Sequence, residues 1–194
     1  IMYPNSKKSL NETTVVENKI HPSYYGAAHT KLYIEKMCNF FSKISTTKFT
    51  IVRHSNIYGP YDKFDLRTGH FIGSSFKKVL EKKNNIKIFG SGSEKRDFLY
   101  IDDLINFIKI VITKQKTKFE IVNCSYGKSY SIYNVLKKIL KISNSKKKIT
   151  KIKSESINID LLISNKKAKE LFSWRPMVTL DIGLKKTFDW LIKK

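Results

Sequence analysis

One compact run of β-branched and aromatic residues, Lys48-Phe49-Thr50-Ile51-Val52-Arg53-His54, has the composition of a β-strand. In the segment before it, from about Gly26 to Ser45, apolar side chains recur at the spacing of one helix face, at Leu32, Ile34, Met37, Phe40 and Phe41. A long helix that leads through a short loop into a strand is the repeating unit of an α/β fold with a parallel sheet. We therefore predict an α/β protein.

The same alternation continues toward the C-terminus. A loop rich in Gly, Pro, Tyr and Asp at 55–69 separates the first strand from the next helix. Helices are expected at 70–83, 104–113, from Ser131 onward, at 166–172 and at 180–192, and strands at 86–89, 97–101, 119–123, 149–152 and 157–163. Asp102 or Asp103 is the expected N-cap of the helix at 104–113. Residues 1–22 are expected to hold the end of a strand followed by a polar loop.

The composition is globular and limits the classes of partner. Hydrophobic residues make up 41% of the 194 residues, and no apolar run approaches the ~20 residues that span a bilayer. There is no secretory signal, and Cys38 and Cys124 lie in apolar runs, which favours buried, reduced thiols in a cytoplasmic protein. Only four of the 38 basic residues are arginine, so the net charge of +22 indicates a lysine-covered surface, and a nucleic-acid partner is not expected.

The helix before the first strand opens with Tyr24-Tyr25-Gly26-Ala27-Ala28-His29-Thr30-Lys31, which places phenols and an ammonium group on neighbouring turns. A free phenol has a pKa near ~10, so it acts as an acid or base at neutral pH only where a positive charge lowers that pKa. We interpret Tyr25 and Lys31 as the candidate catalytic centre. No metal site is predicted.

Four motifs carry a resemblance to a known family. They are Tyr25-Gly26 with Lys31-Leu32 and Glu35, Arg53-His54-Ser55-Asn56-Ile57-Tyr58-Gly59-Pro60, Phe89-Gly90-Ser91-Gly92 with Arg96-Asp97-Phe98-Leu99-Tyr100-Ile101-Asp102-Asp103, and Trp174-Arg175-Pro176. In this order they resemble the extended short-chain dehydrogenase/reductases of the NAD-dependent epimerase/dehydratase family, which act on nucleotide sugars. Within that family the pattern is most similar to the GDP-L-fucose synthases.

The resemblance implies roles for individual residues. Lys31 would hold the nicotinamide ribose of NADP or NAD and lower the pKa of the catalytic tyrosine, Tyr25. His54, Ser55, Asn56 and Ile57 would lie along the nicotinamide, with Asn56 also near the substrate. His70 would be the acid that serves epimerisation, and Lys78, Phe89 and Arg96 would bind the nucleotide sugar. Family members are often homodimers built on long helices, and residues 27–45 would supply one.

Other readings of the same residues stay open. Arg96 could form a structural ion pair with Asp102 or Asp103, His70 could simply begin its helix, Lys78 could be one more surface lysine, and Phe89 could be core. Trp174-Arg175-Pro176 is expected to pack and to stop a helix.

Three departures from the family pattern affect the expected activity. The family spaces its tyrosine and lysine as Tyr-x-x-x-Lys, but the residue four before Lys31 is Ala27, so either two residues are inserted within 27–29 or the phenol is lost. Ile1 stands where fucose synthases carry the cysteine that acts as the epimerisation base. The glycine-rich dinucleotide turn would lie before Ile1, so the chain is expected to be a fragment that lacks this part.

We therefore predict the C-terminal part of a Rossmann-like parallel sheet combined with a smaller α/β substrate domain. Residues 1–56 and 98–125 would belong to the Rossmann-like part, and 57–97 and 126–194 to the nucleotide-sugar domain. The predicted activity is NADP-dependent reduction at C4 of a GDP-4-keto-6-deoxyhexose, with epimerisation in question. The alternatives are an NAD-dependent nucleotide-sugar 4-epimerase or dehydratase, a non-catalytic nucleotide-sugar-binding relative, and a basic nucleic-acid binder.

Overall fold

A computed structural model describes residues 2–153 and 159–194. Ile1 and residues 157 and 158 of the strand expected at 157–163 therefore lie outside the described residues. In residues 159–163 only Ile163 forms a β-bridge, with Leu10, so the strand expected there is wrong. In chain order the elements are η1 (Glu12–Thr14), η2 (Glu17–Lys19), η3 (Pro22–Tyr24), α1 (Tyr25–Ile44), β1 (Phe49–His54), β2 (Asn56–Tyr58), α2 (Phe71–Leu80), β3 (Asn85–Phe89), β4 (Lys95–Tyr100), α3 (Ile101–Lys114), β5 (Phe119–Cys124), β6 (Ser129–Ser131), α4 (Ile132–Ile142), β7 (Lys148–Ile152), α5 (Lys166–Phe172) and α6 (Leu180–Ile192).

The strands form three small sheets, and most of the pairing is parallel. β1 pairs with β5 in parallel from Phe49↔Phe119 to His54↔Cys124. β2 and β4 are also parallel, while β6 runs antiparallel on the other edge of β4. β3 and β7 form a separate parallel pair. The predicted α/β class with parallel strands is confirmed.

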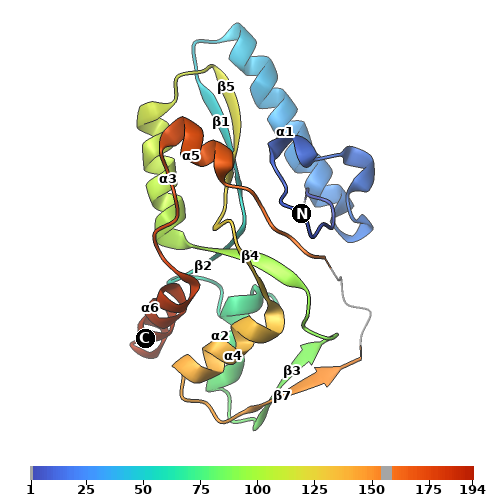
Figure 1. Ribbon diagram of the computed structural model, residues 1–194, viewed down its shortest axis with the longest axis vertical. Helices are drawn as coiled ribbons and strands as arrows, with labels where there is room; N and C mark the ends of the chain where they lie inside the picture. Colours follow the sequence, from blue (N-terminus) through green and yellow to red (C-terminus); the bar gives the residue numbers. More distant parts are fainter. Residues whose placement is uncertain (1, 154–158) are drawn as a thin grey trace.

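Helices cover these sheets in two groups. In Figure 1, β1 and β5 lie between α1 on one side and α3 and α5 on the other. α2, α4 and α6 gather at the opposite end, beside β3 and β7. β4 connects the groups, because its Leu99 packs with α3, α5 and β5, whereas its Phe98 and Tyr100 pack with α2, α4 and α6. The predicted domain division stays a proposal, and α5, assigned to the substrate domain, packs on α3 and β5.

Several expected details of the fold are wrong. No strand lies within the described residues 2–9, and η1, η2 and η3 occupy the segment that was expected to be a loop. Tyr100, not an aspartate, is the N-cap of α3. Asp103 is buried in the first turn of that helix and accepts hydrogen bonds from the backbone N–H groups of Met177 (2.9 Å) and Val178 (3.0 Å). Tertiary contacts therefore use a carboxylate that local reasoning assigned to a cap.

The segment Trp174-Arg175-Pro176 packs as expected but does not itself end α5. Trp174 is 1% exposed and lies in the core with Phe107 and Phe172. The helix ends at Phe172, and its C-cap, Ser173, adopts the left-handed backbone conformation with φ 54°. The backbone N–H of Trp174 then donates to the Ala168 carbonyl, which would otherwise lack a partner at the helix end.

Gly183 of α6 gives a test of the packing of α6 against β2 and β4. A Cβ atom there would fall on the Tyr58 hydroxyl and lie 2.9 Å from the Tyr100 ring. Overpacking of this kind costs about 1–3 kcal/mol, so Gly183→Ala should lower the free energy of unfolding by that amount in urea denaturation. Gly26 in α1 has nothing within 4 Å of its Cβ position, so Gly26→Ala is the matched control and should stabilise the protein. Equal effects at the two sites would contradict the described packing.

Candidate active site

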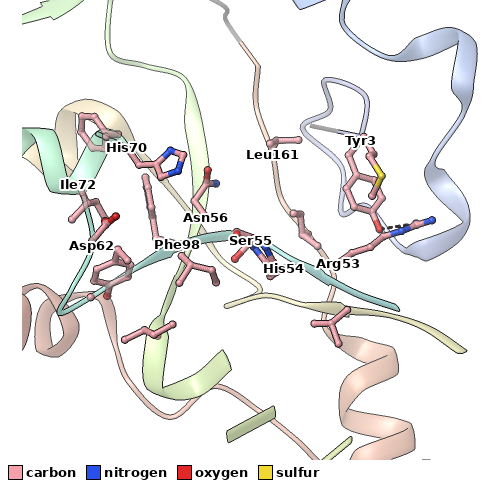
Figure 2. A pocket seen from close by; sticks show the side chains of 18 of the residues that line it. Tyr3, Arg53, His54, Ser55, Asn56, Asp62, His70, Ile72, Phe98 and Leu161 are labelled. Carbon is pink, nitrogen blue, oxygen red and sulfur yellow. Dashed lines mark hydrogen bonds between the residues drawn. The ribbon is translucent and has the colours of Figure 1, made fainter. Parts of the chain in front are cut away.

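The described residues form a cleft of about 910 Å³. Its walls come from α1, β1, β2, the loop after β2, the start of α2 and the segment around Leu161, and Figure 2 shows the side chains that line it. Six of the predicted site residues line this one cleft: Lys31, His54, Ser55, Asn56, Ile57 and His70. The fold thus brings together three segments that are distant in the sequence.

Lys31 reaches the cleft from the second turn of α1. The ammonium has no carboxylate partner within the described ranges 2–153 and 159–194. Glu35, one turn further along the same helix, is instead bonded to Arg53. Lys31 is therefore the cation of the cleft that remains available to a ligand.

Tyr25 does not share the cleft with Lys31. It is 62% exposed at the first residue of α1, and its ring lies on His29 with 4.2 Å between the ring centroids. α1 runs without a break from Tyr25 to Ile44, so Ala27 occupies the position one turn before Lys31. The arrangement therefore gives no support to the predicted insertion, and no phenol occupies that turn.

Residues 54–57 cross from one sheet to the next. β1 ends at His54 beside β5, and β2 begins at Asn56 beside β4, with the Ser55 N–H donating to the Cys124 carbonyl (3.0 Å). The Asn56 amide donates to the Asp97 carbonyl (2.8 Å), and the His54 Nδ1 lies 2.8 Å from the Ser55 carbonyl oxygen. These bonds fix a short turn whose side chains line the cleft.

His70 is the N-cap of α2 and makes no capping bond with its side chain. The preceding loop is held by the Asp65 carboxylate, which accepts from the backbone N–H (2.7 Å) and the hydroxyl (2.6 Å) of Thr68. Gly69 closes the loop by donating to the Asp65 carbonyl (3.1 Å). In Figure 2, His70 and Asn56 project above the β1–β2 ribbon from different elements.

Three predicted substrate residues lie outside the lining of the cleft. Lys78 is in the last turn of α2, where burial lowers its pKa and its carbonyl accepts from the Lys147 ammonium (2.8 Å). Phe89 is 60% exposed at the end of β3. Arg96 is on β4, opposite Tyr130 of β6. It is on the same face of β4 as Phe98, which does line the cleft. The alternative ion pair of Arg96 with Asp102 or Asp103 is wrong for the described residues, in which Arg96 pairs with no carboxylate and Asp103 serves two backbone amides.

The sequence reasoning missed a buried polar network beside Lys31. The Arg53 guanidinium forms a two-bond fork with the Glu35 carboxylate, Nε to Oε1 at 2.8 Å and Nη2 to Oε2 at 2.6 Å. Its Nη1 donates to the Glu12 carbonyl (2.8 Å) and to the Tyr3 hydroxyl (3.4 Å). Burial works to lower the Arg53 pKa, but the bonds to Glu35 and Tyr3 hold it above its ordinary value. An arginine within an otherwise apolar strand was the signal that could have revealed this network.

Asp97 is a buried carboxylate on β4 next to the cleft residue Phe98. It is fully buried and accepts from the backbone N–H groups of Tyr126 (2.9 Å) and Gly127 (2.8 Å). Burial raises its pKa from 3.8 to about 6 despite these bonds. The carboxylate thereby holds the turn that follows β5.

The raised pKa of Asp97 predicts a pH dependence of stability. The unfolded chain releases this proton at lower pH than the folded protein, so the stability that Asp97 contributes is complete below its unfolded pKa and is lost as the pH rises through its folded pKa. At 1.36 kcal/mol per pKa unit, the free energy of unfolding should fall by up to about 3 kcal/mol between pH 3.8 and about 6. Urea denaturation of the wild type and of Asp97→Asn across this pH range should give free energies of unfolding whose pH dependences differ by this amount. Parallel pH dependences would contradict the prediction.

Metal ligands and membrane-spanning helices are two further features that bear on the class of site. Among the described residues no group of three or more His, Cys, Asp or Glu side chains could hold a metal ion. In the same part of the chain, no helix has the length and apolar character needed to cross a membrane.

Nucleotide-sugar enzymes are among the known proteins to which this chain is similar. GDP-L-colitose synthase of Yersinia pseudotuberculosis is 27% identical over 199 residues, covering 100% of this chain and 65% of that protein. A GDP-L-fucose synthase of Sinorhizobium fredii is 25% identical over 193 residues, covering 97% and 61%. The crystal structure of UDP-glucuronic acid 4-epimerase from Bacillus cereus, in complex with UDP-glucuronic acid and NAD, superposes with a TM-score of 0.81 at 26% identity, covering 99% and 59%.

The chain thus spans less than two thirds of the length of these relatives. The matched region of the family model covers residues 1–125, which include α1, the β1–β2 turn, His70 and β4. On this match, the chain belongs to the NAD dependent epimerase/dehydratase family.

Proposed function

We propose that this chain acts on nucleotide sugars as part of an NAD(P)-dependent reductase or epimerase, most like GDP-L-fucose synthase. The observation that carries the proposal is that Lys31, the His54–Ile57 turn and His70 line one cleft. The reaction would be reduction at C4 of a GDP-4-keto-6-deoxyhexose with NADPH. The related GDP-L-colitose and GDP-L-fucose synthases support this choice over a UDP-sugar 4-epimerase.

The residues of the cleft fit a nicotinamide nucleotide. The Lys31 ammonium is free of carboxylates within the described residues and can donate to ribose hydroxyls, while the apolar lining at Ile57, Phe98 and Leu161 suits a planar ring. When bound, the cofactor supplies the hydride. The contribution of Lys31 would be to hold the ribose and to place a positive charge beside the oxygen that gains negative charge at C4.

The substrate would be held and protonated by the other wall of the cleft. Asn56, in the lining, can hydrogen-bond sugar hydroxyls, and Arg96, outside the lining but on the Phe98 face of β4, would pair with a diphosphate that extends beyond the cleft. His70 is in the lining, and histidine is the side chain that most commonly transfers protons near neutral pH. We assign proton transfer at the sugar to His70, because the turn before Lys31 carries Ala27 and Tyr25 points elsewhere.

Ala27 and Tyr25 also favour a second candidate function, a protein that binds nucleotide sugars without catalysis. Loss of a general acid typically costs about 10²–10⁴ in rate, so a chain with Ala27 in place of the phenol would bind substrate but turn it over slowly or not at all.

One experiment separates these candidates. The complete gene product is incubated with NADPH or NAD and with GDP-4-keto-6-deoxymannose, UDP-glucuronate or UDP-glucose, and binding is measured by calorimetry and products by NMR. Conversion of the GDP sugar with NADPH supports the proposed reductase, and conversion of a UDP sugar with NAD points to the 4-epimerase. Binding without products supports the non-catalytic candidate, and neither binding nor products would refute both.

We also propose a homodimer through α1. One side of this helix exposes Tyr33 (62%), Phe40 (54%) and Ile44 (65%), more apolar surface than a solvent-facing helix usually carries. Light scattering should give twice the monomer mass, and Phe40→Glu should shift the population to monomer. A monomeric wild type at micromolar concentration would refute this assembly.

A further inference from the structure

We infer that Arg53 and Glu35 are positioning residues, which hold Lys31 at a fixed place relative to the His54–Ile57 turn. Glu35 is four residues after Lys31 on α1, so both side chains project from one face of the helix. Arg53 is the residue directly before His54 on β1. Their two-bond fork therefore joins the two halves of the cleft at its inner wall, which both side chains line.

The fork is built to fix geometry. The two side chains are 6% and 9% exposed, and all three guanidinium nitrogens of Arg53 donate hydrogen bonds, to Glu35, Tyr3 and the Glu12 carbonyl. A planar guanidinium that meets a carboxylate through two parallel bonds allows one relative orientation, which a lysine cannot reproduce. Burial excludes water, which would otherwise compete for these hydrogen bonds and allow the pair to change its orientation.

α1 contacts β1 and β5, but its buried apolar cluster is formed with another segment. The buried apolar residues of α1, Ala28 and Leu32, cluster with Met2 and Ile20 of the N-terminal segment and not with β1. The fork supplies a directional contact between α1 and β1. Because a misplacement of about 1 Å at a reacting group can cost about 100-fold in rate, this contact bears directly on the Lys31 position.

The test separates positioning from stability and rests on the proposed function for its rate measurements. The main variant replaces the fork with an apolar pair, Arg53→Met with Glu35→Leu, because such replacements of buried ion pairs commonly preserve or raise stability. Arg53→Lys, which keeps the charge but loses the second bond, is the companion variant if the double variant does not fold. Glu17→Gln breaks the exposed ion pair between Glu17 of η2 and Lys36 of α1 and is the matched control.

The expected result for the double variant is a melting temperature near that of the wild type, a kcat about 100-fold lower and a KM for the nucleotide sugar changed little. The backbone amide chemical shifts of Lys31 and residues 54–57 should move, while those of β3 and β7 and every property of the control stay the same. A folded double variant with wild-type kcat and unmoved shifts would overturn the inference. If the wild type turns over no nucleotide sugar, the proposed function fails, and the chemical shifts, which need no substrate, still decide the positioning role.

Discussion

Replacement of Lys31 by methionine is expected to lower kcat by about 10²–10³-fold, the usual loss when one preorganised group is removed from a developing oxyanion. Methionine keeps the length of the side chain and removes the charge, so α1 should keep its fold. The expectation rests on the absence of any carboxylate partner for Lys31 in the described part of the chain and on its place in the cleft lining. NADPH oxidation in the presence of the sugar substrate measures the change.

Lys36 supplies the control for this prediction. It is on the same helix, outside the cleft lining, in an ion pair with Glu17 in which the two side chains are 67% and 52% exposed. Exposed pairs contribute roughly 0–1 kcal/mol, so Lys36→Met should leave kcat near the wild-type value. If Lys31→Met and Lys36→Met behaved alike, Lys31 would be an ordinary surface charge. A loss confined to KM in Lys31→Met would instead assign Lys31 to binding alone.

The sequence predicted the helices well because their signals are local. α5 and α6 begin and end where the periodicity placed them, and Thr179 and Ser131 cap α6 and α4 through their hydroxyls, as residues of this type commonly do. The missed strands β2 and β6 have three residues each. A segment that short becomes a strand only because β4 lies beside it, and no local pattern records that neighbour.

The residues of the candidate site also differ in how far the sequence could predict them. The pairing of a phenol with an ammonium group near a helix start singled out Lys31, whereas His54–Ile57 and His70 were predicted only through the family resemblance. The direction of the Tyr25 side chain depends on its exact position in the helix, because each residue turns that direction by roughly 100°. Six positions before Lys31, the Tyr25 ring contacts His29 in a tilted arrangement, and neither residue lines the cleft. The fork of Arg53 and Glu35 joins residues 18 positions apart through tertiary contact, beyond the reach of any periodicity.

Trp174→Ala is expected to lower the free energy of unfolding by about 3–5 kcal/mol, the range for removal of a buried tryptophan. The indole is 1% exposed, lies 4.9 Å from the Phe107 ring centroid at 55°, and fills the core in which α3, β5 and α5 meet. Since β5 pairs with β1 up to His54, this core also supports the strand that carries half of the cleft. Chemical denaturation followed by circular dichroism measures the loss.

Trp174→Phe distinguishes lost volume from lost polarity. The Trp174 Nε1 is buried and has no hydrogen-bond partner in the described residues, and an unsatisfied donor costs about 1–3 kcal/mol. Phenylalanine removes that N–H and keeps most of the ring, so the two effects should partly cancel and leave a loss well below that of Trp174→Ala. Met177→Ala, in the same segment but 66% exposed, should change stability by no more than about 0.5 kcal/mol. A phenylalanine variant as unstable as the alanine variant would show that the indole nitrogen is satisfied in solution, and that shape alone holds this core together.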